Sequence, residues 1–259
     1  MNQIFNLNRF ANLFIKHTVD NYKMYLMAFG VLVGVLFFSL GFSRYVNNES
    51  LTINNQVSFF VFFLMMGGSI FTSIIFSDLG NKKKAIAMLT LPASHFEKFL
   101  IGWIWSYVIF QLLFIPVFYI SVTVINQLFH HNVSDNPQLM SIFSAGQTNY
   151  SFLVFFAALH AIVLWASIYF ETYHFIKIAF AFFVSLLLLA YLNVQFLRLI
   201  ITKSIEGATI FFNVRVNENG TYFFLRMPDD KLKYILIMLM VFAAILWAAA
   251  FYRLKEKEV

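Results

Sequence analysis

The chain has 259 residues, of which 61% are hydrophobic and only 12% are charged, whereas a soluble domain carries about a quarter charged residues. This composition excludes an ordinary soluble protein, and the absence of cysteine excludes disulfides and thiolate metal sites. The net charge is +6, but the basic residues are scattered at the ends of apolar stretches, which argues against nucleic-acid binding. Apolar stretches of about twenty residues recur, as expected of an integral membrane protein.

The N-terminal segment, residues 1–23, has the pattern of an amphipathic helix. Apolar residues recur at helical spacing, with polar and basic residues between them: Ile4, Leu7, Phe10, Ala11 and Phe14. The pattern predicts a helix that lies in the membrane interface ahead of the first span. The alternative is a simple cytoplasmic extension of that span.

Six stretches are long enough to cross the hydrocarbon core, which predicts an all-α integral membrane protein with residues 1–259 in one transmembrane domain. They are Met24–Phe42, Val57–Ser77, Phe99–Gln127, Ser151–Phe170, Phe175–Leu197 and Leu232–Tyr252. The first is too long for a cleavable signal peptide, so we expect it to remain as an anchor. The third contains Pro116, which predicts a kink or a tilt.

The distribution of Lys and Arg sets the expected orientation. With six spans, the side that carries both termini holds 11 of these residues and the opposite side holds 7. Because positive charge accumulates on the cytoplasmic side, both termini are predicted to be cytoplasmic. The outer stretch from Arg198 to Lys233 runs against the rule, with six basic residues, but it also carries four acidic ones.

The outer segment 198–231 alternates in hydropathy. The stretch "ATIFFNVRV" is followed by "NENG" and then by "TYFFLRM", with apolar residues at every second position on either side of the turn. Alternation around a short turn that ends in glycine predicts a β-hairpin within Ala208–Met227, before the last span.

The cytoplasmic loop 78–98 contains the stretch "LTLPASHFEKFL". Ser94 and Glu97 have the spacing of a capping box, so a helix is predicted to begin at Ser94, and Pro92 ends whatever helix precedes it. That preceding piece, Asn81–Leu91, opens with Lys82, Lys83 and Lys84 and continues with apolar residues that include Ile86 and Leu89. Such a short helix is suited to docking on a partner, although a basic turn that follows the charge rule is the alternative.

Few polar residues lie within the spans, and no span has a charge at its centre, which argues against a carboxylate relay or a voltage sensor. The candidate pathway residues are Ser69, Thr72, Gln111 and His160. Ser69 and His160 lie at similar expected depth, as in an intramembrane serine hydrolase, but the residue after Ser69 is not glycine and no oxyanion donor is evident. The small residues of "GGSIFTS" favour close helix packing instead.

The stretch "LPASHFEKFL" closely resembles a segment of ABC-2 type ABC transporter permeases, especially those of Bacteroidota, and the order of elements along the whole chain resembles the family's plan. The resemblance implies a bacterial cytoplasmic-membrane permease that lacks an ATPase site and cofactors of its own. It would pair with a second permease chain in the lipid bilayer. A separate ABC ATPase subunit, which binds ATP and Mg²⁺, would drive export by pushing on a coupling helix.

The resemblance places the coupling function on specific positions. Those that would contact the ATPase or transmit its push are Lys82, Lys83, Lys84, Ile86, Leu89, Pro92, Ser94 and Glu97. The family's usual outer segment is a short helix, and the hairpin pattern departs from it. The alternatives are a membrane assembly or sensor component that transports nothing, and an intramembrane serine hydrolase.

Overall fold

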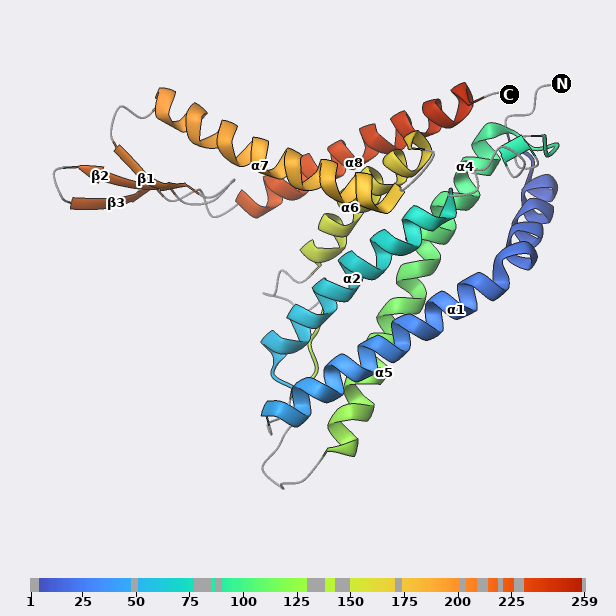
Figure 1. Cartoon of the computed structure of the whole chain (residues 1–259), viewed down its shortest axis with the longest axis horizontal. Helices are drawn as coiled ribbons and strands as arrows, with labels where there is room; N and C mark the ends of the chain where they lie inside the picture. The colour runs from blue at the N-terminus through green and yellow to red at the C-terminus, as the bar shows by residue number, and fades with distance from the viewer. Residues whose placement is uncertain are drawn as a thin grey trace.

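The computed structural model describes residues 5–47, 51–76, 85–86, 90–129, 138–142, 150–170, 174–200, 204–208, 214–218, 221–225 and 231–257. Its helices are α1 (Leu7–Asn47), α2 (Ile53–Ile75), α4 (His95–Trp103), the π-helix η2 (Ile104–Ile109), α5 (Phe110–Leu128), α6 (Ser151–Tyr169), α7 (His174–Ile200) and α8 (Lys231–Glu256). Its strands are β1 (Ser204–Ala208), β2 (Val214–Glu218) and β3 (Thr221–Leu225). Figure 1 shows the helices as one elongated bundle with the small sheet at one end.

Five helical stretches of the described chain are long and apolar enough to cross a membrane: Leu7–Val46, Ile53–Ile75, His95–Leu128, Ser151–Tyr169 and Leu232–Glu256. Each contains most or all of one predicted span, so the chain fits a multi-pass membrane protein. The other predicted span, Phe175–Leu197, coincides with α7, which is not among those five. The six-span layout therefore stays a prediction.

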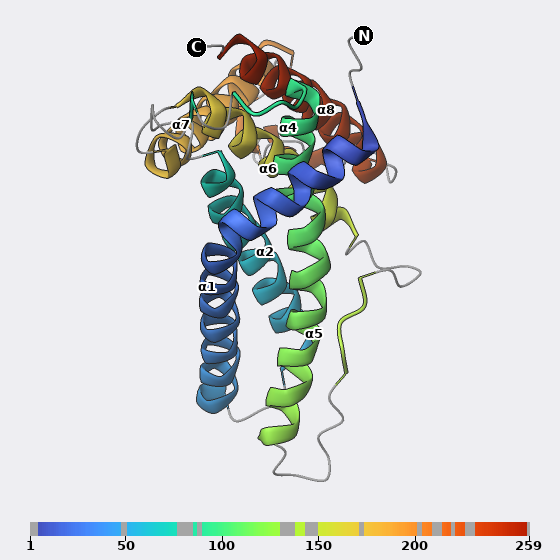
Figure 2. The same cartoon turned by 90° about the vertical axis from the view of Figure 1, so that its right-hand side faces the viewer.

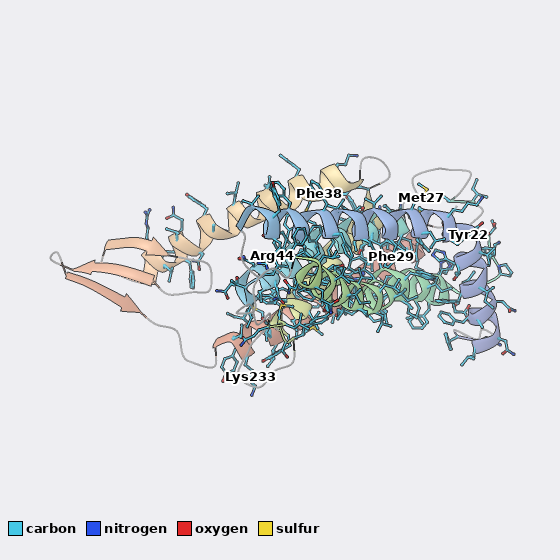
Figure 3. All side chains as sticks on the ribbon, turned by 90° about the horizontal axis from the view of Figure 1, so that it is seen from below. Tyr22, Met27, Phe29, Phe38, Arg44 and Lys233 are labelled. Carbon is cyan, nitrogen blue, oxygen red and sulfur yellow. The ribbon has the colours of Figure 1, made fainter. Side chains whose placement is uncertain are left out.

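Successive long helices run in alternating directions. The two termini consequently lie at the same end of the bundle, close to the start of α4 (Figures 1 and 2). Arg44, near the end of α1, and Lys233, near the start of α8, lie toward the opposite end from Tyr22 (Figure 3). This arrangement is what an even number of crossings requires.

Helix α1 is a single helix of 41 residues that bends near Tyr22 (Figure 3). Two side chains before the bend bond back to the helix: Thr18 Oγ1 donates to the Phe14 carbonyl (2.8 Å) and Asn21 Nδ2 to the His17 carbonyl (3.0 Å). Such bonds compete with the backbone ladder and bend helices. The amphipathic N-terminal segment thus continues into the first apolar stretch without a break.

The centre of the bundle is α6, which packs along α8 and α2. Small residues of these helices are fully buried, among them Ala157 and Ala161 on α6 and Ala243 on α8. Gly68 on α2 lies so close to the ring of Phe156 that a methyl group there would overlap it. The interpretation of "GGSIFTS" as a packing surface is therefore confirmed at Gly68.

The third apolar stretch is built from three consecutive pieces, α4, η2 and α5. Within it the hydrogen-bond ladder shifts: the Phe110 N–H donates to the Trp105 carbonyl, five residues back, as in a π-helix. Pro116 lies inside α5, two turns further on. On either side of Pro116 in the chain, Phe114 and Phe118 pack with Phe60 of α2 in the largest apolar cluster of the described residues.

The outer segment forms a three-stranded antiparallel sheet in the order β1-β2-β3. The pairing of β2 with β3 places Val216 opposite Phe223 and Glu218 opposite Thr221, which is a hairpin within the predicted Ala208–Met227 range. Strand β2 covers the second part of the predicted first arm, and residues 209–213 of that arm lie outside the described residues. Strand β1, which pairs with β2 across a bulge between Ile205 and Gly207, was not predicted.

Candidate coupling site

The start of α4 has the predicted capping box. Ser94 Oγ accepts from the Glu97 N–H (3.2 Å), and a Glu97 carboxylate oxygen accepts from the Ser94 N–H (2.9 Å). Immediately before it, the Ala93 N–H donates to the Leu91 carbonyl (2.7 Å), which makes a tight turn centred on Pro92. The direction of the chain into α4 is therefore fixed on both sides of Ala93.

The Glu97 carboxylate also binds two residues of the N-terminal segment, Asn6 and Arg9. Arg9 donates to both of its oxygens, from Nε to Oε2 (2.7 Å) and from Nη2 to Oε1 (2.8 Å), and the Asn6 N–H donates to Oε1 (2.8 Å). The Glu97 side chain is fully buried in this arrangement. A two-pronged guanidinium–carboxylate pair fixes orientation as well as distance, so it holds the start of α1 against the start of α4. We call Asn6, Arg9, Ser94 and Glu97 the clamp.

A second contact joins α1 to η2, the π-helix that directly follows α4. The rings of Phe14 and Tyr25 both stack on Trp105 of η2, with centroids 5.7 and 4.5 Å apart, and these two residues lie on either side of the bend at Tyr22. His17 Nε2 and Tyr25 Oη are 2.6 Å apart and brace the bend from within α1. The bend is thus seated on Trp105.

The predicted docking helix Asn81–Leu91 is described only at residues 85–86 and 90–91. Ala85 and Ile86 are helical, the Thr90 N–H donates to the Ile86 carbonyl (2.9 Å), and the Ile86 side chain is 46% exposed. The described residues thus carry one helix-type hydrogen bond, between Thr90 and Ile86, ahead of Pro92. Lys82, Lys83, Lys84 and Leu89 lie outside the described residues.

Two buried polar side chains, Ser106 and His160, meet the half-buried Trp247 next to Trp105, each from a different helix. Trp247 Nε1 of α8 donates to His160 Nδ1 of α6 (3.1 Å), and His160 Nε2 lies 2.8 Å from Ser106 Oγ of η2. Because Nδ1 accepts from Trp247, a neutral His160 carries its proton on Nε2 and donates to Ser106. Ser106 then donates to the Gly102 carbonyl (2.7 Å).

This proton arrangement is opposite to that of a hydrolase. A general base must accept the serine proton, whereas here the ring nitrogen facing Ser106 is a donor and the serine proton is used by a backbone carbonyl. The network instead links η2, α6 and α8 with all three side chains satisfied.

Within the part of the chain that the structure describes, no hydrogen bond directly joins two of the candidate pathway residues. Thr72 is buried and bonds the Gly68 carbonyl of its own helix (2.7 Å), while Ser69 and Gln111 are half-buried. Among the described residues, the hydrogen bonds of His160 go to Ser106 and Trp247, and Ser69 takes no part in them.

Sequence reasoning missed three residues that complete these contacts. Arg9 was counted only as a cytoplasmic charge, and Ser106 and Trp247 were not singled out. No local pattern marks any of them, because their partners lie 88, 54 and 87 residues away in the chain. A tryptophan or a serine inside an apolar helix would have been the available signal, since each must find a partner there.

No protein-family model, curated protein or solved structure matches this chain.

Proposed function

We propose that this chain is the membrane-spanning permease subunit of an ATP-driven ABC exporter of the ABC-2 type. The observation that carries the proposal is the clamp: the carboxylate that caps α4, in the segment that resembles the family, is bound by Arg9 of the N-terminal helix. A subunit driven from outside needs its cytoplasmic elements joined stiffly to its spans. The clamp and the tight turn at Pro92 supply such a joint.

The route of transmission follows the same contacts. A push on Asn81–Leu91 by a partner ATPase reaches α4 through the turn at Pro92, and reaches α1 through the clamp and Trp105. From η2 it passes to α6 and α8 through Ser106, His160 and Trp247. ATP and Mg²⁺ are bound by the partner and not by this chain, and a second copy or a related permease completes the transporter.

Two pairs of substitutions test the proposal on the complex of this chain with a candidate ABC ATPase subunit. Ile86→Asp with Leu89→Asp puts charge on the docking piece, and we expect loss of the co-purified ATPase. Ser94→Ala with Glu97→Ala removes the capping box and the ion pair, and we expect the ATPase to remain bound while its hydrolysis rate changes. Val46→Asp, at an exposed apolar residue at the other end of the bundle, is the matched control and should behave as the parent.

Each result bears on a different part of the proposal. Equal ATPase yield and equal hydrolysis in the parent and both double variants would contradict a coupling role for this segment. Loss of the ATPase in the Ser94, Glu97 pair as well would place docking, rather than transmission, at the capping box.

A further inference from the structure

At the end of the bundle away from the termini, Gln56 ties a loop segment to α2. Gln56 is fully buried in the first turn of α2. Its Nε2 donates to the carbonyls of Leu51 (2.7 Å) and Gln138 (2.8 Å), and its Oε1 accepts from the Met140 N–H (2.9 Å). The amide therefore holds the segment Gln138–Ile142 in the way that a neighbouring strand would.

The same segment is bound to α5 from its other side. Tyr119 Oη donates to the Met140 carbonyl (2.9 Å), so both backbone polar groups of Met140 are used, one by α2 and one by α5. The side chains of Met140 and Ile142 are buried in the apolar cluster between these helices, beside Val122. Residues flanking them in the segment, such as Leu139, are exposed.

This geometry couples the segment to the separation of the two helices. If the ends of α2 and α5 move apart, Met140 cannot keep its bonds to both Gln56 and Tyr119, and its side chain must leave the cluster. We infer that Gln138–Ile142 is a latch that keeps this end of the bundle closed and is released when the end opens. The inference rests on the proposed function in taking this end as the outer, export side.

The test uses external thiol labelling in intact cells, which is clean because the chain has no native cysteine. Val122→Cys places a thiol beneath the latch, and a charged, membrane-impermeant maleimide reports its access to outside water. Tyr119→Phe removes one hydrogen bond and should raise the labelling rate about fivefold, and Gln56→Met, which removes three, should raise it further. Ser58→Ala removes an exposed hydrogen bond within α2 and should leave the rate unchanged.

Three outcomes separate the possibilities. The expected order of rates is Gln56→Met above Tyr119→Phe above the parent and Ser58→Ala. Equal rates in all four backgrounds would overturn the latch, and would leave ATPase docking at the opposite end untouched. If the reagent cannot reach a Leu139→Cys thiol from outside, the outer placement of the segment is overturned. Rapid labelling of Leu139→Cys in the Tyr119→Phe protein, which retains its aromatic ring, also confirms that this variant is inserted.

Discussion

Glu97 combines two roles that are usually carried by different residues. It completes a local helix cap, and it neutralises a cation from a helix that lies 88 residues earlier in the chain. Four N–H donors reach its two oxygens, from Asn6, Arg9 and Ser94. A buried carboxylate is stable only with such partners, because an unpaired one loses its hydration without compensation.

The first prediction concerns this balance. Arg9→Met should lower the midpoint of thermal unfolding in detergent by several degrees, because it leaves the Glu97 carboxylate buried with only its backbone donors. Glu256→Gln is the matched control: it breaks an exposed ion pair with Arg253 (3.0 Å), which contributes little when solvated, and the midpoint should stay within about one degree of the parent. A larger loss for the control than for Arg9→Met would contradict the role of the clamp.

The second prediction concerns the Ser106, His160 and Trp247 network. Ser106→Ala removes the acceptor of the His160 N–H at a fully buried imidazole, which should cost about 1–3 kcal/mol of unfolding free energy. In a Trp247→Phe background the same change should cost less, because Nδ1 no longer accepts a hydrogen bond and His160 can carry its proton there instead of on Nε2. A double-mutant cycle measures the difference between the two costs. Additive costs would contradict a coupled network.

The same geometry predicts the outcome of active-site labelling. A fluorophosphonate probe should not label the wild-type chain, because His160 donates to Ser106 and does not activate it. Labelling that disappears in Ser106→Ala or in Ser69→Ala would restore the hydrolase alternative.

At the scale of elements, what could be predicted depended on how local its cause is. The start of α4 follows from Ser94 and Glu97, which lie within four consecutive positions, and the spans follow from hydropathy alone. The hairpin follows from alternation around a turn, but β1 lacks alternating apolar residues and pairs through a bulge, so it left no pattern to detect. The π-helix at Ile104–Ile109 likewise has no local signature; it sits where Trp105 and Ser106 have long-range partners.

The third prediction tests the packing of α2 against α6. Gly68→Ala should destabilise the protein by about 1–3 kcal/mol, because the added methyl group overlaps the Phe156 ring. Phe156→Leu should recover part of that loss, since it vacates the space. Gly34→Ala is the control, because nothing lies within 4 Å of the new methyl group there and alanine favours a helix. Equal losses at Gly68 and Gly34 would contradict close packing at Gly68.

At the scale of the whole molecule, the open question is the number of crossings. Among the described residues, five helices qualify by length and hydropathy, and α7 decides whether the chain crosses five or six times. Because each crossing reverses the side, α7 also decides on which side the C-terminus lies.

The fourth prediction follows. With six crossings and a cytoplasmic N-terminus, a thiol at Leu128→Cys, which is highly exposed at the end of α5, should react with an impermeant maleimide added outside. Lys255→Cys, exposed near the end of α8, should react only after the cells are permeabilised. External labelling at both positions would mean five crossings, and labelling only at Lys255 would reverse the orientation.

The unbroken path of α1 through its bend has a mechanical consequence. The arm before the bend, Leu7 to Tyr22, is about 22 Å long, and the part from Tyr22 to Arg44 is about 33 Å long, at 1.5 Å per residue. If α1 pivots where its bend contacts Trp105, it acts as a bent lever, and the length of its far arm is about 1.5 times that of its near arm. A displacement of 1 Å imposed on Arg9, about 20 Å from the bend, would therefore become roughly 1.7 Å at Arg44, beside the end of α5 to which Arg44 is bonded through the Phe129 carbonyl.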